Sequence, residues 1–250
     1  MRSSRPGRAR GRGTCDEPFR PTAGPPQAAG GAHRHLRARP RRSGPRRRAR
    51  CRTLDLLGRA SDSSLDKLGT PGAFYADPAV RIGLPLVGRG LGGGLGGTVL
   101  GLLDKGQQLG LTDNLIRKLN DAAGSAAHEA KPIFRTAISR LTLADVPDIA
   151  TRHDGATQYL RTSAGGELSG KLRPLVDRGL TSVGALREID RLVAKTPLLR
   201  SAGLSRDFVG RSVTEQALNG IFSYIGAEEG RLRDNPVGAA GGLLKGLLGN

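Results

Sequence analysis

Residues 111–141 read LTDNLIRKLNDAAGSAAHEAKPIFRTAISRL and carry apolar side chains at steps of three and four residues. The apolar row consists of Leu111, Leu115, Leu119, Ala122, Ala126, Ala130, Ile133, Ala137 and Leu141. Because an α-helix turns once every ~3.6 residues, this spacing places the row on one face and predicts a helix from about Thr112 to Arg140. Pro132 lacks a backbone N–H, so we expect the helix to kink or split near residues 129–131.

Similar spacing on both sides of this helix predicts an all-α protein. Helices are expected at residues 54–68, 142–151, from 154 through Leu160, 168–180, 183–194, 206–233 and 243–248. Polar residues suited to helix starts precede three of them: Thr142 with Asp145 as a capping box, Asp154, and Ser205. No convincing run of alternating strand residues occurs. We therefore predict a single multi-helix bundle domain over residues 53–250.

An extended and glycine-rich segment, residues 73–94, interrupts the helical pattern. Val80, Ile82 and Leu84 alternate with other residues between two prolines, which predicts an extended arm packed across the helices. Residues 84–103 contain one charge and eight glycines. Their length also suits a membrane span, but interior glycines weaken a helix, so we expect a loop leading into a helix near residues 95–109.

The positive charge of the chain is concentrated at its N-terminus. The net charge is +18 overall, and residues 1–52 hold 16 arginines, no lysine and two acids, whereas residues 53–250 hold 24 basic and 20 acidic groups. This distribution excludes a uniformly basic protein of the histone or ribosomal type. Seven prolines, seven glycines and very few large apolar residues predict that the Arg/Gly/Pro-rich tail, residues 1–52, is disordered.

The tail admits three interpretations. Its densest cationic run could bind nucleic acid or another polyanion through Arg41, Arg42, Arg46, Arg47, Arg48 and Arg50. An export signal would need an apolar core of about 7–15 residues, which the sequence as given lacks. The third interpretation is a mis-assigned start in a GC-rich gene, in which case the tail does not belong to the natural protein and nucleic acid is no partner.

Familiar catalytic and metal-binding patterns are missing from the body. Residues 53–250 have no cysteine, two histidines (His128 and His153), no G-x-S-x-G and no H-E-x-x-H. We expect no cofactor, no metal and no catalytic residue. Glu228 and Glu229 stand three and four residues before Arg231 and Arg233, so they form either surface ion pairs or, with Tyr224, one wall of a polar pocket.

Several separate motifs carry a resemblance to a known family. They are Asp77–Pro85 (DPAVRIGLP), Leu119–Ala123 (LNDAA), Leu143–Asp145, Ala156–Leu160 (ATQYL), Val213–Phe222, Glu228-Glu229, Arg233, Asn235-Pro236 and Leu243–Lys245. In this order they resemble the bacterial domain of unknown function 4197 family over residues 54–250. The resemblance implies an α-helical protein, usually exported in Gram-negative bacteria, with no established activity. A periplasmic or envelope location is therefore expected, and a cytoplasmic one is the alternative.

The resemblance also selects candidate functional residues. The polar members of its motifs are Asn120, Asp145, Thr157, Tyr159, Glu228, Glu229 and Arg233. We expect a non-enzymatic helical envelope protein in which these residues converge into a patch for an unidentified protein or small ligand. The alternatives are polyanion binding through the tail and a hydrolase that uses Glu228 or Glu229 as its base. No transmembrane span is expected, and contact with a membrane surface stays open.

Overall fold

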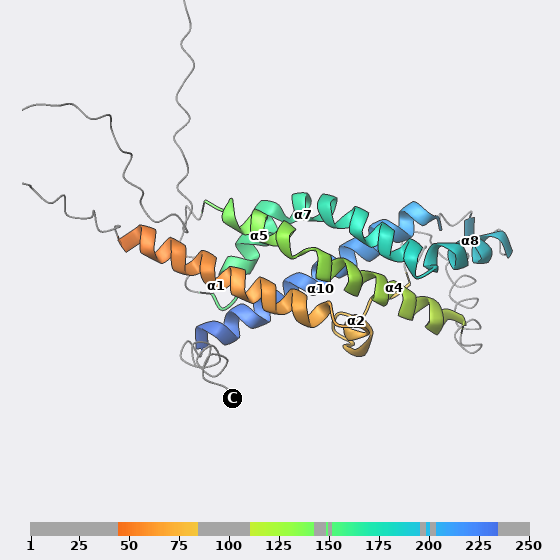
Figure 1. Ribbon diagram of the computed structural model, residues 1–250, viewed down its shortest axis with the longest axis horizontal. Coiled ribbons are helices and arrows are strands. Elements are labelled where there is room, and N and C mark those ends of the chain that lie inside the picture. The colour runs from red at the N-terminus through yellow and green to blue at the C-terminus, as the bar shows by residue number, and fades with distance from the viewer. Residues whose placement is uncertain are drawn as a thin grey trace, which may run out of the picture.

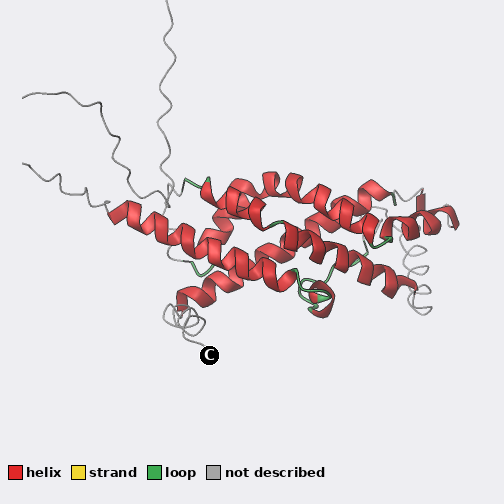
Figure 2. Cartoon of the chain, in the orientation of Figure 1, coloured by secondary structure: helices red, strands yellow, loops and turns green. Residues whose placement is uncertain are grey.

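The structure is a computed structural model that describes residues 45–84, 111–142, 149, 152–195, 199–200 and 204–234. Its helices are α1 (Pro45–Leu68), α2 (Ala73–Ala76), α4 (Leu111–Glu129), α5 (Lys131–Ser139), α7 (Gly155–Ser182), α8 (Ala185–Lys195) and α10 (Arg206–Asp234). They form an elongated bundle, and the part of the chain that is described contains no strand (Figures 1 and 2). The predicted all-α fold is confirmed.

The core of the bundle lies between the long helices. α10 packs along α7 and α1, and α4 packs along α7. The predicted row on α10 is confirmed, because its members have no exposed surface: Val209, Val213, Ala217, Ile221 and Ile225. Ser205 caps this helix as expected, since its Oγ accepts a hydrogen bond from the N–H of Phe208 at 3.2 Å.

Pro132 divides the predicted helix of residues 112–140 into α4 and α5, as the sequence indicated. The break falls at Ala130, and Pro132 occupies the first turn of α5. A proline costs no hydrogen bond at that position because first-turn N–H groups have no partner inside the helix. The carbonyl of Ala130 instead accepts bonds from the N–H groups of Ile133 and Phe134.

Two helix boundaries differ from the predictions. α1 begins at Pro45, so the predicted disordered tail, residues 1–52, is wrong for its last eight residues. Arginine is a good helix former and proline suits a helix start, and Arg50 donates to the carbonyl of Leu141 at 2.9 Å. α7 joins the two helices predicted after Asp154 and at 168–180, because the buried Ala164 continues the apolar row between them.

The arm of residues 77–84 packs across the helices as predicted, but it is not extended throughout. Residues 78–80 form a turn, because the N–H groups of Val80 and Arg81 donate to the carbonyl of Asp77. Val80 and Ile82 are buried and Leu84 is half-buried against the core. The short helix α2 before this arm was not predicted. Other predictions fall outside the described residues: the glycine-rich segment beyond Leu84, the helix near 95–109, the capping box at Asp145, the helix at 243–248, and Arg41 and Arg42 of the tail. Among the described helices, none is long and apolar enough to cross a membrane.

Candidate functional site

Glu229 joins α10 to the start of α7. Its side chain is fully buried. Its Oε1 accepts a hydrogen bond from the N–H of Ala156 at 3.0 Å, and its Oε2 accepts bonds from the N–H and Oγ1 of Thr157 at 2.8 and 2.6 Å. The first N–H groups of a helix lack partners inside it and carry partial positive charge, so a carboxylate is well placed there. Glu229 therefore caps α7 from another helix.

The predicted cap, Asp154, occupies the N-cap position of α7 but does not perform this role. Its carboxylate makes no capping hydrogen bond, and its Oδ2 accepts instead from Nε2 of Gln158 at 2.7 Å. The prediction for Asp154 is wrong in this respect because Glu229 already occupies the N–H groups of the first turn. A contact between residues 72 positions apart is not visible in local spacing.

Arg233 completes the buried cluster around Glu229. Its Nε and Nη2 donate to Oε1 of Glu229 at 3.0 and 2.6 Å, and Nη2 also donates to the carbonyl of Ile149 at 3.2 Å. The backbone of Ile149 in turn lies against Gly155, where an added Cβ would clash with the carbonyl oxygen of Ile149. The start of α7 is therefore fixed by Glu229, Arg233 and a glycine that permits close approach.

Glu228 belongs to a second cluster, between α10 and α1. Its Oε1 accepts from Oγ of Ser63 at 3.0 Å and from Arg231 at 2.6 Å, and its Oε2 accepts from Nζ of Lys67 at 2.9 Å. The hydrogen bonds from Arg231, followed by those from Lys67 and Ser63, outweigh the opposing effect of burial and lower the pKa of Glu228 to about 2. The carboxylate is therefore ionised throughout the physiological range.

Asn120 on α4 binds the backbone of the arm. Its Oδ1 accepts from the N–H of Ile82 at 2.8 Å, and its Nδ2 donates to the carbonyl of Ile82 at 2.8 Å. Gln216 on α10 does the same for Gly83, at 3.0 and 3.3 Å. The two amides thus serve as partners for the backbone groups of Ile82 and Gly83, because buried backbone groups require hydrogen bonds.

The remaining candidate residues lie elsewhere. The Tyr159 hydroxyl is 3.3 Å from Oγ1 of Thr142. Tyr224 does not face Glu228, because its hydroxyl donates to Oδ2 of Asp77 at 2.7 Å. Asp145 lies outside the described residues.

The structure thus brings together three of the candidate residues, Thr157, Glu229 and Arg233, and places Asn120, Tyr159 and Glu228 in separate contacts. Gln216, which contacts the arm, precedes Glu229 by 13 positions on α10, a separation of about 20 Å along a helix. The two ion pairs expected from spacing, of Glu228 with Arg231 and Glu229 with Arg233, do form. They differ from the expectation in that both carboxylates are buried.

Three residues that take part in these contacts were not predicted from the sequence: Ser63, Lys67 and Gln216. Ser63 and Lys67 stand four residues apart on α1, a spacing that places them on one face but does not identify Glu228 as their target. Gln216 lies inside the Val213–Phe222 motif, but it is one of several polar residues there, so nothing in the local sequence singled it out.

These hydrogen bonds disfavour a role for the two buried carboxylates as catalytic bases. Each oxygen of Glu228 and Glu229 accepts two or more hydrogen bonds, so proton abstraction by either would break the contacts between helices. Within the described ranges no group of three or more His, Cys, Asp or Glu side chains is arranged to hold a metal ion.

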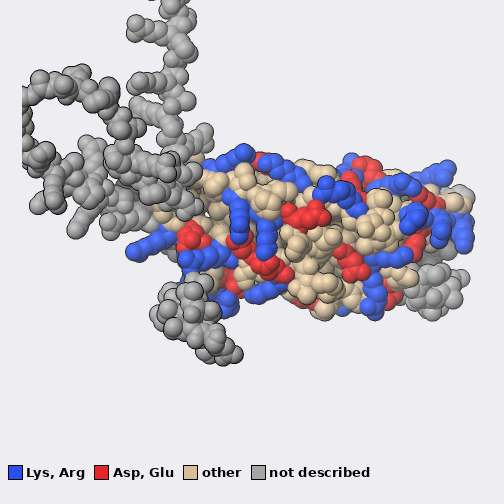
Figure 3. Space-filling model, in the orientation of Figure 1, with Lys and Arg blue, Asp and Glu red and all other residues tan. Residues whose placement is uncertain are grey.

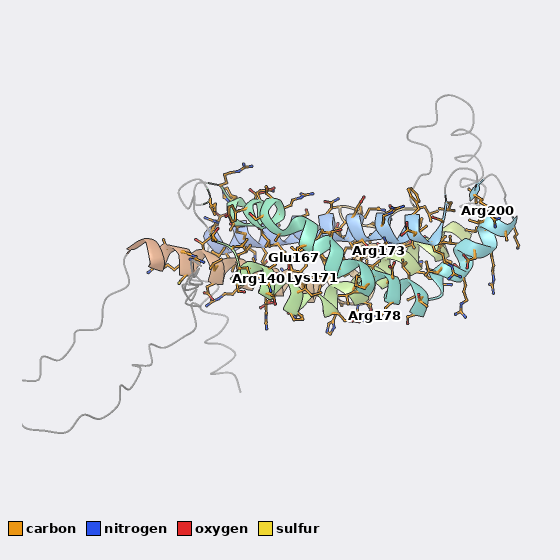
Figure 4. The ribbon with its side chains drawn as sticks, turned by 90° about the horizontal axis from the view of Figure 1, so that it is seen from above. Arg140, Glu167, Lys171, Arg173, Arg178 and Arg200 are labelled. Carbon is orange, nitrogen blue, oxygen red and sulfur yellow. The ribbon has the colours of Figure 1, made fainter. Side chains whose placement is uncertain are left out.

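The outer face of α7 carries charged side chains and a shallow hollow. Figure 4 shows Glu167, Lys171, Arg173 and Arg178 along this helix. Glu167 accepts from Lys171 at 2.6 Å and from Arg140 at 3.1 Å, so these charges are paired. The hollow near the end of α7 is open and is lined by Asp177, Arg178, Thr181 and Ser182. Arg178, one of the lining residues, is paired with Glu129 of α4 at 2.7 Å.

Comparison with known proteins agrees with the motifs quoted from the sequence. No match was found among curated proteins or among solved structures. Residues 54–249 match the family described as "Protein of unknown function (DUF4197)". This matched range includes the candidate residues Asn120, Thr157, Glu228, Glu229 and Arg233. The match covers more than half of the chain, and the protein therefore belongs to this family.

Proposed function

We propose that this protein is a non-enzymatic helical protein of the cell envelope that binds a macromolecular partner through the outside of its bundle. The observation that carries the proposal is the complete hydrogen bonding of the buried carboxylates. Glu228 and Glu229, the bases that a hydrolase would need, are both occupied in joining helices. The envelope location is supported by the family resemblance noted from the sequence.

The same proposal is supported by the structural role of four candidate residues, Asn120, Thr157, Glu229 and Arg233. These residues accept from or donate to neighbouring segments and present no arrangement of free polar groups to a small ligand. A protein whose motif residues maintain its shape functions through the surface that this shape presents. Figure 3 shows this surface, on which lysine, arginine, aspartate and glutamate side chains cover the outer faces of the helices.

Photo-crosslinking in the producing cells tests this proposal. A photoreactive amino acid is placed singly at exposed positions on four helices, Ser125 on α4, Ser163 on α7, Ala194 on α8 and Ser223 on α10. We expect a discrete adduct from one face and none from the opposite face. Absence of an adduct from every face, together with a small molecule retained by the native protein in mass spectrometry, would contradict the proposal.

Polyanion binding through the tail is the second candidate. Four of the six arginines of the cationic run lie within α1, at positions 46, 47, 48 and 50, so a deletion of the whole run would also remove the start of this helix. The test therefore replaces these four arginines, together with Arg41 and Arg42, by glutamine, which removes the charge and keeps residues that favour a helix. Loss of duplex DNA retention and of its steep salt dependence would support this candidate. Retention that does not change on this replacement would contradict it.

A further inference from the structure

α8 presents a row of cations at one end of the bundle. Arg187, Arg191 and Lys195 are exposed and follow one another at four-residue spacing, which places them on one face of the helix. Ala185 and Ile189 are buried on the opposite face. We call Arg187, Arg191 and Lys195 the α8 row. Its members lie about 6 Å apart along the helix axis, because each residue advances the helix by about 1.5 Å.

The acids of α8 do not neutralise this row. Glu188 pairs with Lys118 of α4, and Asp190 pairs with Arg206, whose Nε is 2.9 Å from Oδ1. None of the three cations of the α8 row has an acidic partner among the residues that the structure describes. The row therefore differs from the cations on α7, where Lys171, Arg173 and Arg178 are each paired with a carboxylate.

The α8 row is unfavourable for the isolated protein. Like charges four residues apart repel each other on a helix. Arg187 also lies in the first turn of α8, where the partial positive charge of the helix terminus disfavours a cation. The helix terminus favours Lys195 in the last turn, but this accounts for only one member of the row. An anionic partner would remove both unfavourable interactions.

The position of α8 favours a flat partner. Figure 1 shows α8 at the end of the elongated bundle opposite to the start of α1, and Figure 3 shows lysine and arginine gathered at that end. Arg200 lies at the same end in Figure 4. Half-buried Leu192 and Val193 flank the α8 row, and α8 has no aromatic ring on which a nucleic-acid base could stack.

From this arrangement we infer that the α8 row docks the protein, end-on, onto an anionic lipid surface. The inference rests on the proposed function, in which the protein works through the outside of its bundle, and it assigns one end of that outside to a lipid surface. The charges of Arg187, Arg191 and Lys195 face the lipid phosphates, while Leu192 and Val193 lie at the edge of the contact. Each cation near an anionic bilayer strengthens binding about fivefold, so the row accounts for about a hundredfold in affinity.

A tryptophan reporter tests the inference in the full chain, which contains no natural tryptophan. Ala194→Trp places the reporter within the α8 row, and Ser163→Trp places a control reporter on the exposed face of α7. Vesicles contain phosphatidylcholine with about a third phosphatidylglycerol, enough to give an anionic surface, and a small amount of lipid with a nitroxide on its headgroup. We expect quenching at position 194, little at position 163, and none at either with vesicles of phosphatidylcholine alone.

Substitutions then assign the effect to the row. In the Ala194→Trp background, the triple change R187Q/R191Q/K195Q should raise the lipid concentration for half-quenching about a hundredfold. The change R187K/R191K keeps the charge and should keep the quenching. The control triple R59Q/R140Q/R178Q removes the same charge from paired cations and should have little effect. Circular dichroism verifies that all variants keep their helix content.

Three results would overturn the inference. They are equal quenching at positions 163 and 194, full quenching in the R187Q/R191Q/K195Q variant, and retention of duplex DNA by the α8 row without any vesicle binding. The lipid test can fail without contradicting the proposed function, because a crosslinked adduct from another helix would still support partner binding. Failure of both tests would remove the proposed function as well.

Discussion

The buried carboxylate of Glu229 on α10 caps α7 by accepting a 2.8 Å hydrogen bond from the backbone N–H of Thr157. The change Glu229→Gln keeps the shape but places an amide donor against the donors of Ala156, Thr157 and Arg233. We expect a loss of about 3 kcal/mol in the free energy of unfolding, because a buried charge pair loses one member. Urea denaturation measures this loss.

The control for that change is Glu167→Gln, which removes a carboxylate that is 43% exposed and paired with Lys171 on the surface of α7. The urea midpoint of this variant should stay close to that of the wild type, since solvent screens exposed pairs. Equal effects of Glu229→Gln and Glu167→Gln would show that Glu229 has no special role in the fold.

Glu228 should make the stability of the protein depend on pH in the acid range. Its pKa is lowered from an ordinary value of 4.5 to about 2 in the folded state. A lowered folded pKa stabilises the protein above the unfolded pKa, and this contribution is lost as the pH falls from 4.5 toward 2. We expect it to be about 2 kcal/mol, below the full linkage value because Lys67 and Arg231 are exposed and screened.

The variant Glu228→Gln tests this pH dependence by urea denaturation at a series of pH values. It should be less stable than the wild type at pH 7, and the difference should shrink as the pH falls through 4.5 and disappear near 2. A difference that stays constant over this interval would mean that packing of the side chain, and not its charge, supports the contact between α10 and α1.

Asn120→Ala should loosen the arm of residues 77–84. The change leaves the N–H and C=O of Ile82 without partners in a buried position, and we expect a loss of about 2–3 kcal/mol in the free energy of unfolding. Hydrogen exchange of the Ile82 amide, followed by NMR, should accelerate more than that of amides in α10. Gln216→Ala should do the same for Gly83, with a smaller loss because this contact is only partly buried.

Two serines on α1 should respond in opposite directions to replacement by alanine. The hydroxyl of Ser61 is buried and has no hydrogen-bond partner among the described residues, so Ser61→Ala should raise the free energy of unfolding by about 0.5–1 kcal/mol. Ser63 donates to Glu228, so Ser63→Ala should lower it by about 1 kcal/mol. Equal signs in thermal or urea denaturation would contradict the assignment of these hydroxyls.

The sequence allowed most of the helices to be predicted, but not the contacts between them. Apolar spacing predicted the α4 and α10 rows, and Pro132 predicted the break at Ala130, because these features are local. The capping of α7 by Glu229 and the arm contacts of Asn120 and Gln216 join residues far apart in the chain. Such pairings depend on which helix faces which, and a single sequence carries no signal for that.

Two glycines of α7 should also respond in opposite directions to alanine. Gly179 faces α4, where an added Cβ would lie 2.8 Å from the carbonyl oxygen and 3.1 Å from the Cα of Ala122. Because backbone atoms cannot move aside as a flexible side chain can, Gly179→Ala must separate α7 from α4. We expect a loss of about 1–3 kcal/mol in the free energy of unfolding.

Gly170 provides the matched control on the same helix. It is exposed, and an added Cβ would meet no atom within 4 Å. Alanine stabilises a helix by about 1 kcal/mol relative to glycine, so Gly170→Ala should raise the free energy of unfolding by about that amount. Urea denaturation of both variants separates the two effects, because helix propensity alone would make both changes stabilising. If Gly179→Ala were also stabilising, the close approach of α4 and α7 at Ala122 would be wrong.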